Sequence, residues 1–247
     1  MKKFSIIIFI SALATLCFAT SAAAQTADEY AALGNSAYKK GDYAAARDFY
    51  NLAKDAGGNS AELHFNAGNA AAKLGKKGEA LLEYLRAKLE NPRLREADAN
   101  LKMLAADNNL TLPQKTRIQD SVFELSDSEW TVAAFTAFWC AVLSAFLPPL
   151  WGKRNAAYVF LSLIFACATA CSIFAIAQYA QFKSLGVALE DDVALRISPT
   201  PHAKIAATLQ EGTLAKILQR HGNFVYAATD NGKRGWAEIG KFEPVQQ

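Results

Sequence analysis

Ionisable side chains are absent from two long stretches of this sequence. Residues 131–151 and residues 156–180 contain no Asp, Glu, Lys, Arg or His. An α-helix needs about 20 predominantly apolar residues to cross the hydrocarbon core of a bilayer, so each stretch is long enough to cross once. Two core helices of a soluble protein are disfavoured, because the flanking segments supply too little apolar surface to enclose them. The sequence therefore predicts transmembrane helices at 130–151 and 156–180.

The predicted spans also lack the charged side chains that usually mark an ion or proton pathway, which disfavours transport. Cys167 and Cys171 lie one helical turn apart in the second span. They are either a redox or metal pair or, the interpretation we favour, small residues on a helix-packing face. We expect the two helices to act as a membrane anchor.

Catalytic and metal-binding groups are scarce elsewhere in the chain. The only histidines are His64, His202 and His221, and none has a second histidine at metal-ligand spacing. All four cysteines lie in apolar segments, so the other regions contain no nucleophilic thiol and no disulfide. A glycine-serine elbow and a phosphate-binding loop are both absent. We expect a protein that is not an enzyme, without catalytic residues, metal or cofactor.

An excess of one charge is also absent from the two predicted domains. The net charge is +3, but residues 25–112 contain equal numbers of acidic and basic side chains, as do residues 184–247. The excess lies in the N-terminal segment, in the linkers and in the turn at 152–155 between the spans. We therefore expect no nucleic-acid-binding surface.

The N-terminus has the three parts of a secretory signal peptide. Two lysines precede an apolar segment, and three alanines precede Gln25, so residues 1–24 are predicted to be a signal peptide cleaved after Ala24. An uncleaved anchor is the alternative. Lipidation at Cys17 is not expected, because the preceding residue is the large Leu16.

The turn at 152–155 sets the expected orientation in the membrane. It contains Lys153 and Arg154, and basic turns face the cytoplasm by the positive-inside rule. Both flanking regions then lie on the other side. We expect a multi-pass protein of the inner (cytoplasmic) membrane whose N- and C-terminal domains are extracytoplasmic, in the periplasm.

Residues 30–57 and 64–91 resemble each other when they are aligned at a constant offset along the sequence. The length of this offset is typical of an array of helix-turn-helix units. Residues 95–107 are predicted to form a final capping helix. The pattern resembles the tetratricopeptide repeat, so we expect an all-α tetratricopeptide domain over 25–107. Its small residues would let paired helices approach closely, and its tyrosines would fill the space between repeats. The recurring residues are Gly34 and Gly68, Asn35 and Asn69, Lys39 and Lys73, Gly41 and Gly75, Ala46 and Ala80, and Tyr50 and Tyr84.

The resemblance to this repeat implies a concave groove that receives peptides or proteins. General protein binding is the function we favour, and a clamp for a C-terminal carboxylate and a purely structural stalk are the alternatives. The side chains expected in the groove are Asn35, Tyr38, Lys39, Phe65, Asn69 and Lys73.

A linker over 108–129 leads into the first span, and the chain after the second span changes to strand-and-turn character. Short strands at regular spacing, with a hairpin-turn signal at 230–232, predict a small all-β barrel over 184–247. This run resembles the bacterial SH3-type domain, whose glycine-tryptophan pair stands here as Gly235 and Trp236.

Three aromatic residues form the candidate site of the predicted barrel. Alternation along a strand places Phe224 and Tyr226 on one face, so we expect them to share an environment with Trp236. The balanced charge gives no strong field toward charged polymers, and the family pattern is not kept at Ala194 and Ser198. Peptidoglycan is therefore a disfavoured ligand.

The order of these parts resembles one family: a signal peptide, a tetratricopeptide array, two spans with a small basic turn, and an SH3-type barrel. That family is BatE, of the Bat aerotolerance operons, and the resemblance covers essentially the whole mature chain. It implies a multidomain membrane protein that is a non-enzymatic adaptor or scaffold. Its partners would be von Willebrand factor A-domain Bat proteins linked to a MoxR-type AAA+ ATPase. A cell-wall tether and an envelope sensor are the alternative functions.

The predicted topology has a direct test. Alkaline phosphatase fused after Asp107 or after Gln247 should be active in intact cells, because both positions would lie outside the cytoplasm. A reporter that works only in the cytoplasm, fused at the same positions, should be silent. A cytoplasmic signal from either position would contradict the orientation.

Overall fold

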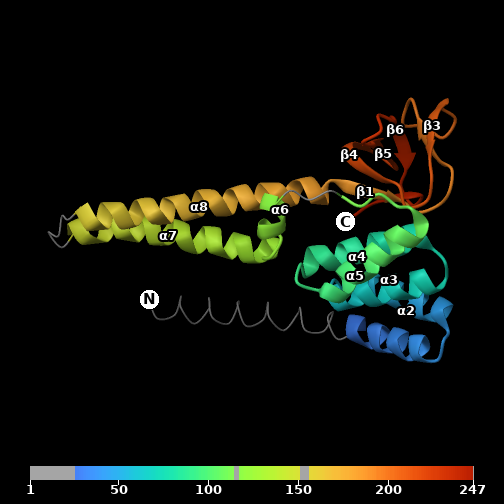
Figure 1. Ribbon diagram of the computed structural model, residues 1–247, viewed down its shortest axis with the longest axis horizontal. Coiled ribbons are helices and arrows are strands. Elements are labelled where there is room, and N and C mark those ends of the chain that lie inside the picture. Colours follow the sequence, from blue (N-terminus) through green and yellow to red (C-terminus); the bar gives the residue numbers. More distant parts are fainter. Residues whose placement is uncertain (1–25, 114–116, 151–155, 247) are drawn as a thin grey trace, which may run out of the picture. The chain divides into compact units, whose positions relative to one another are not determined.

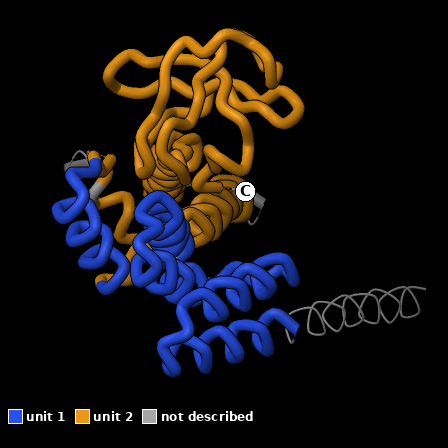
Figure 2. Tube along the Cα trace, turned by 90° about the vertical axis from the view of Figure 1, so that its right-hand side faces the viewer, with its two compact units in different colours: residues 1–90, 96–110 blue, residues 91–95, 111–247 orange. Residues whose placement is uncertain are grey.

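The computed structural model describes residues 26–113, 117–150 and 156–246. The predicted signal peptide and the turn at 152–155 lie outside the described residues. The chain divides into two compact units (Figure 2), one with residues up to 90 together with 96–110, the other with 91–95 together with 111–247. The first unit is helical, and the second contains two apolar helices and an antiparallel sheet.

The first unit is a series of helices joined by short turns (Figure 1). Asp42 and Ser60 begin two of the helices, since their side chains accept hydrogen bonds from backbone N–H groups three residues ahead. The predicted breaks at Gly41 and Gly75 are confirmed, because both residues lie between helices with φ angles of 81° and 74°. The helices span residues 26–39, α2 (Tyr43–Asp55), α3 (Ala61–Lys73), α4 (Lys77–Glu90) and α5 (Arg95–Asn108).

Glycine and tyrosine pack against each other once in each helical pair. A Cβ atom placed on Gly34 would lie 2.5 Å from the Tyr50 ring, and one on Gly68 would lie 2.7 Å from the Tyr84 ring. Such distances are too short for any side chain, so only glycine lets each tyrosine ring lie against the neighbouring helix. The tyrosine rings therefore fill space within each pair, and the prediction that they fill the space between repeats is wrong. The two contacts recur with the period predicted from the sequence.

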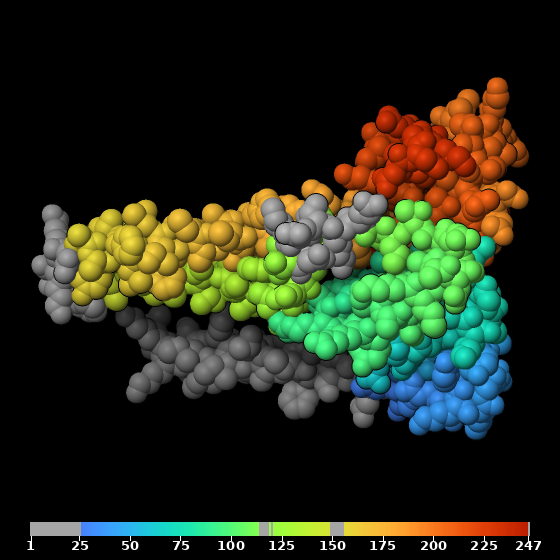
Figure 3. All heavy atoms as spheres, viewed as in Figure 1, coloured from blue at the N-terminus to red at the C-terminus, as the bar shows by residue number. Residues whose placement is uncertain are grey.

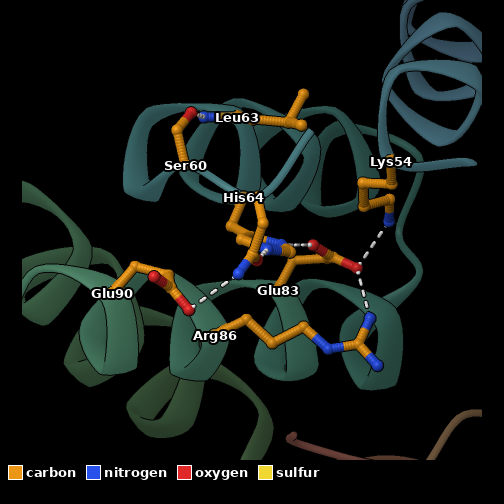
Figure 4. Close-up of polar contacts among 8 residues, drawn as sticks. Lys54, Ser60, Leu63, His64, Glu83, Arg86 and Glu90 are labelled. Atoms are coloured by element: carbon orange, nitrogen blue, oxygen red, sulfur yellow. Dashed lines mark hydrogen bonds and ion pairs between the residues drawn. The ribbon is translucent and has the colours of Figure 1, made fainter. Parts of the chain in front are cut away.

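A buried ion cluster joins three helices of this unit (Figure 4). Glu83 on α4 is 2% exposed. Its carboxylate lies 2.7 Å from Lys54 Nζ of α2, 2.7 Å from His64 Nδ1 of α3 and 3.0 Å from an Arg86 nitrogen. The second ring nitrogen of His64 lies 2.8 Å from the side-chain oxygen of Asn59. Sequence analysis did not identify the cluster.

Two opposing effects, burial and the interactions with its partners, determine the pKa of Glu83. Burial by itself would raise the pKa of the carboxyl group, because it disfavours the charged form. The hydrogen bond to His64 and the charges of Lys54 and Arg86 outweigh burial and lower the pKa to about 2. Glu83 is therefore ionised at neutral pH and stabilises the helical unit through its partners.

Two apolar helices, α7 (Asp127–Leu150) and α8 (Ala156–Lys183), lie side by side (Figure 3). Only 6% of the apolar window of α7 and 11% of that of α8 is buried. A core helix of a soluble protein would be mostly buried, whereas a helix in a bilayer exposes an apolar surface to lipid. Both helices are long and apolar enough to cross a membrane. The second helix continues beyond the predicted end at 180, as far as Lys183.

The residues that form the packing face of α8 are not the cysteines that sequence analysis favoured. Ser172, Ala175 and Tyr179 are buried and recur at the three- and four-residue spacing of one helical stripe. Cys167 and Cys171 are exposed free thiols that lie outside this stripe. The favoured interpretation of these cysteines as helix-packing residues is therefore wrong.

The segment before α7 contains a short helix, α6 (Arg117–Val122), which contacts α8. The hydroxyl group of Tyr179 on α8 donates to the carbonyl oxygen of Leu125. The indole N–H of Trp130 on α7 donates to the carbonyl oxygen of Val122 at 2.8 Å. Part of the predicted linker is therefore hydrogen-bonded to both apolar helices.

The described residues after α8 form a seven-stranded antiparallel sheet in the order β3-β2-β6-β5-β4-β1-β7. A buried cluster that includes Leu195, Val225 and Phe242 is its core. The predicted turn at 230–232 is confirmed between β5 and β6, where Gly232 has a φ angle of 85°. The strands are β1 (Leu185–Ala188), β2 (Val193–Arg196), β3 (Ile205–Leu209), β4 (Leu214–His221), β5 (Phe224–Ala228), β6 (Arg234–Glu238) and β7 (Phe242–Pro244).

Sequence analysis missed strand β1, which is short and contains Gly186. A Cβ atom at Gly186 would lie 2.4 Å from the Phe242 ring, so only glycine leaves room for this ring in the core. Ser184 is the only residue between α8 and β1, and its carbonyl oxygen accepts a hydrogen bond from the N–H of Ile217 at 2.7 Å. The second apolar helix thus continues into the sheet without a flexible linker.

Glu83→Gln tests the buried ion cluster. In a fragment of residues 26–110 at pH 7, we expect the free energy of unfolding to fall by about 3 kcal/mol, because Lys54 and Arg86 lose a buried counter-charge. The measurement is urea unfolding followed by circular dichroism. Asp48→Asn, which removes an exposed ion pair with Arg47, should change it by less than about 1 kcal/mol.

The same cluster predicts an acid dependence. Because the pKa of Glu83 is lower in the folded state, its stabilisation is complete above the ordinary pKa of 4.5 and is lost as the pH falls toward about 2. The shift corresponds to about 3 kcal/mol. The fragment with Glu83→Gln should lose correspondingly less stability over this range, and parallel pH profiles of the two fragments would contradict the assignment.

Candidate functional site

Asn35 and Asn69 occupy equivalent positions in the helical unit. Each side-chain oxygen accepts a hydrogen bond from a tyrosine hydroxyl at 2.8 Å, Asn35 from Tyr50 and Asn69 from Tyr84. Burial raises the pKa of each tyrosine to about 12, so both hydroxyl groups remain protonated donors at neutral pH. The side-chain oxygens of Asn35 and Asn69 are therefore engaged in hydrogen bonds within the fold.

Two further asparagines, which sequence analysis did not select, complete this arrangement. Asn66 Nδ2 donates to Asn35 Oδ1 at 3.1 Å, and Asn100 Nδ2 donates to Asn69 Oδ1 at 2.8 Å. The offset between Asn66 and Asn100 equals the offset between Asn35 and Asn69, and this is the sequence signal that could have identified them. All four side chains are half-buried, so they lie at the surface of the unit.

The other residues predicted for the groove lie close to these asparagines. Lys39 and Lys73 are exposed and follow the two predicted asparagines by four residues, so each lysine shares a helix face with its asparagine. The Tyr38 ring packs edge-on against Tyr43 with centroids 5.1 Å apart. Phe65 lies 6.0 Å from the Tyr84 ring. The surface thus combines amide groups, a cationic flank and aromatic rings.

The candidate aromatic site of the sheet is only partly assembled as expected. Tyr226 and Trp236 lie directly opposite each other on β5 and β6, with ring centroids 5.3 Å apart. Phe224 is 7% exposed and lies opposite Glu238 and His221. It therefore lies two residues along β5 from Tyr226 and outside the Tyr226–Trp236 pair, whose rings remain half-buried.

Cross-strand partners extend the aromatic pair into a row across the outer face. Arg196 lies opposite Trp236, and Gln219 lies opposite Tyr226. Directly opposed residues project from the same face of a sheet. Arg196 also donates to the carbonyl oxygen of Ala203 at 2.8 Å, which fixes its side chain. The row offers stacking surface beside a guanidinium group, a combination that suits ligand binding rather than catalysis.

The edge of this row contains His221, a residue that sequence analysis did not select. The His221 ring lies 6.3 Å from the Trp236 ring in an edge-on arrangement. No sequence period links the two residues, because they come from β4 and β6, which are not neighbours in the sheet. His221 therefore adds a third ring to the outer surface.

In the part of the chain that the structure describes, no group of three or more His, Cys, Asp or Glu could hold a metal ion.

An apolar groove of about 610 Å³ opens beside α6, α7 and α8, with Trp130, Cys171 and Phe174 in its lining. Such a lining provides packing surface and little polar chemistry.

Residues 190–242 match the family described as Bacterial SH3 domain. The matched stretch begins just before β2 and ends at the first residue of β7, so it contains Arg196, Tyr226 and Trp236. The C-terminal sheet is therefore similar to a bacterial SH3 domain from β2 to the start of β7, and we refer to it as the SH3 domain. The match covers this domain alone, and β1 lies outside it. No curated protein matches the chain.

Proposed function

We propose that this protein is a membrane-anchored scaffold that holds binding partners at the outer face of the cytoplasmic membrane. In this proposal α7 and α8 cross the inner membrane, and the helical unit and the SH3 domain both face the periplasm. The exposed apolar surface of the two helices supports the anchor. The SH3 domain supports the location, since bacterial domains of this type are typically extracytoplasmic.

The junction between α8 and β1 is the observation that carries this proposal. Only Ser184 lies between Lys183 and Leu185, and Ser184 is itself hydrogen-bonded to β4. The SH3 domain therefore cannot move away from the end of the helix. A domain that must search for a distant ligand would need a flexible linker. This one would instead present a fixed surface next to the membrane, as a scaffold requires.

The helical unit supplies the proposed site for protein partners. We assign it to the tetratricopeptide type, because the glycine-tyrosine contacts and the asparagine-tyrosine hydrogen bonds both recur at the period of the sequence repeat. The order of domains fits the BatE family of the Bat aerotolerance operons. Its partners would then be von Willebrand factor A-domain Bat proteins linked to a MoxR-type AAA+ ATPase, in an aerotolerance or envelope-stress complex.

Lys39→Glu combined with Lys73→Glu tests the scaffold. We expect the double variant, purified from detergent-solubilised membranes, to lose at least one protein that co-purifies with the parent. Both lysines are exposed, so stability should change by no more than about 0.5 kcal/mol for each substitution. The measurement is mass spectrometry of the co-purified proteins.

Lys40→Glu combined with Lys76→Glu is the matched control. These lysines lie in the turns next to Lys39 and Lys73, so the change of charge is the same while the helix face is left intact. Partner recovery should be unchanged in the control. Equal recovery of all partners by both double variants, with helical circular dichroism retained, would count against protein binding through this face.

A cell-wall tether is the second candidate, and the Tyr226–Trp236 row on the SH3 domain favours it. Since acidic and basic side chains balance in residues 184–247, we expect weak or no retention of this fragment by purified sacculi. The measurement is co-sedimentation with sacculi. Saturable retention that is lost on Trp236→Ala, with the fold intact, would make the tether the better hypothesis.

A further inference from the structure

The short helix α6 and the two apolar helices border a groove that a simple membrane anchor does not require. We call it the α6 groove, and its volume is about 610 Å³. Helix α6 lies against α8 beside the start of α7 (Figure 1). The groove is lined by Ser121 and Val122 of α6, Trp130 of α7, and Ala170, Cys171 and Phe174 of α8. Three helices therefore build one apolar surface.

Contacts on both sides of α6 give the groove a fixed wall. Gln119 Nε2 donates to Gln178 Oε1 of α8 at 3.3 Å. The Phe123 ring lies edge-on to the Tyr179 ring, with centroids 4.4 Å apart. The indole N–H of Trp130 on α7 donates to the backbone of α6 at 2.8 Å. The groove is therefore formed before any ligand arrives, as most sites for small molecules are.

The depth of the groove follows from the polar residues beyond it. Asp127 at the start of α7 pairs with Lys183 at the end of α8, and charged side chains stay at the edge of the hydrocarbon. Along α8, at about 1.5 Å per residue, Cys171 lies about 18 Å from Lys183 and Phe174 about 14 Å. The headgroup layer above the hydrocarbon is only about 5–8 Å thick. In the anchor that we propose, the groove therefore opens into hydrocarbon in the outer half of the bilayer.

Water is a poor occupant of this groove. Among its lining residues, Ser121 and Cys171 supply the only hydroxyl and thiol groups, and the indole N–H of Trp130 already donates within the fold. A bound water needs several polar partners. Left empty, the groove would deprive its lining atoms of dispersion contacts. The lining therefore favours an apolar occupant.

The size of the groove favours a single acyl chain over a helix of another protein. A helix is about 10 Å wide, so a volume of about 610 Å³ would hold only about 8 Å of its length, or about one and a half turns. Helices that associate in membranes usually meet through small residues, whereas Trp130 and Phe174 line this groove. An acyl chain is narrow and flexible, and it is abundant at this depth.

We propose that the α6 groove binds one acyl chain of a phospholipid from the outer leaflet. This inference rests on the membrane anchor of the proposed function and gives that anchor a lipid site. The bound chain fills the space between α6 and α8 and contacts Trp130 and Phe174. It thereby stabilises the packing of the segment before α7 against the helix that leads into the SH3 domain.

Fluorescence quenching tests the contact between the chain and Trp130. Trp139→Phe, Trp151→Phe and Trp236→Phe together leave Trp130 as the only tryptophan of the full-length protein. The probe is a vesicle of phosphatidylcholine with bromine in its acyl chains, because bromine quenches an indole that it contacts. We expect the fluorescence of Trp130 to be quenched in these vesicles.

Ala170→Phe in this single-tryptophan protein fills the groove. We expect it to reduce the quenching of Trp130 about twofold or more, because the added ring takes the place of the chain in contact with the indole. Ala166→Phe is the matched control, since Ala166 is exposed one turn away on α8 and does not line the groove. It should leave the quenching unchanged. Circular dichroism reports whether each variant folds.

A second measurement uses the unchanged protein. Phosphatidylcholine with a diazirine in its acyl chain is cross-linked to the protein in vesicles, and mass spectrometry locates the labelled residues. Phe174 lines the groove and is 52% exposed, whereas its neighbour Ile173 is 58% exposed and does not line it. We expect stronger labelling of Phe174, together with labelling of the buried Val122. General contact with the bilayer would instead label residues in proportion to their exposure.

Three results would overturn the lipid site: no quenching of Trp130, equal quenching in the two folded alanine variants, or labelling in proportion to exposure. Trp139 tests the anchor separately, because it is exposed on α7 away from the groove. A protein that keeps only Trp139 should be quenched whether or not the groove holds a chain. Absence of that quenching would refute the anchor itself, whereas quenching of Trp139 with failure of the groove tests would refute the lipid site alone.

Discussion

A backbone that enters hydrocarbon must satisfy its own hydrogen bonds, and this constraint governs the centre of the chain in the membrane anchor that we propose. Residues 127–150 and 156–183 meet it as two packed helices, and polar interactions lie where α7 begins and α8 ends. There Asp127 pairs with Lys183, and Tyr179 and Trp130 hold the preceding segment by hydrogen bonds. Because α8 passes into β1 after one residue, the end of α8 fixes where the C-terminal sheet begins.

Regular patterns in the sequence predicted the elements that depend on them. A run without charge predicted each apolar helix, glycines in a repeating position predicted the turns at Gly41 and Gly75, and Asp-Asn-Gly at 230–232 predicted the β5–β6 hairpin. In each case the determining interaction is local, so the neighbouring residues carry the information. The SH3 resemblance rested on the same kind of local signals and agrees with the family match.

The features that sequence analysis missed depend on contacts between distant residues. Glutamate is usually found at the surface of a protein. Only the approach of Lys54 and His64 from two other helices makes the burial of Glu83 favourable. Strand β1 pairs with β4 and β7, which come much later in the chain. The asparagines and lysines among the candidate binding residues were identified by their repetition. His221 was not, because its contact with Trp236 joins strands β4 and β6, which lie far apart in the sequence pattern and are not neighbours in the sheet.

In helix α3 the residues that stabilise the fold and the residues that we propose for binding lie on two faces. On its inner face His64 joins the buried cluster, and Gly68 admits the ring of Tyr84. On its outer face Asn66 and Asn69 are held by hydrogen bonds that leave one polar atom of each amide free. Side chains fixed in this way lose little conformational entropy when a ligand arrives, so more of each hydrogen bond appears as affinity. The tyrosine hydroxyls that fix Asn35 and Asn69 therefore also preorganise the surface that we propose for protein binding.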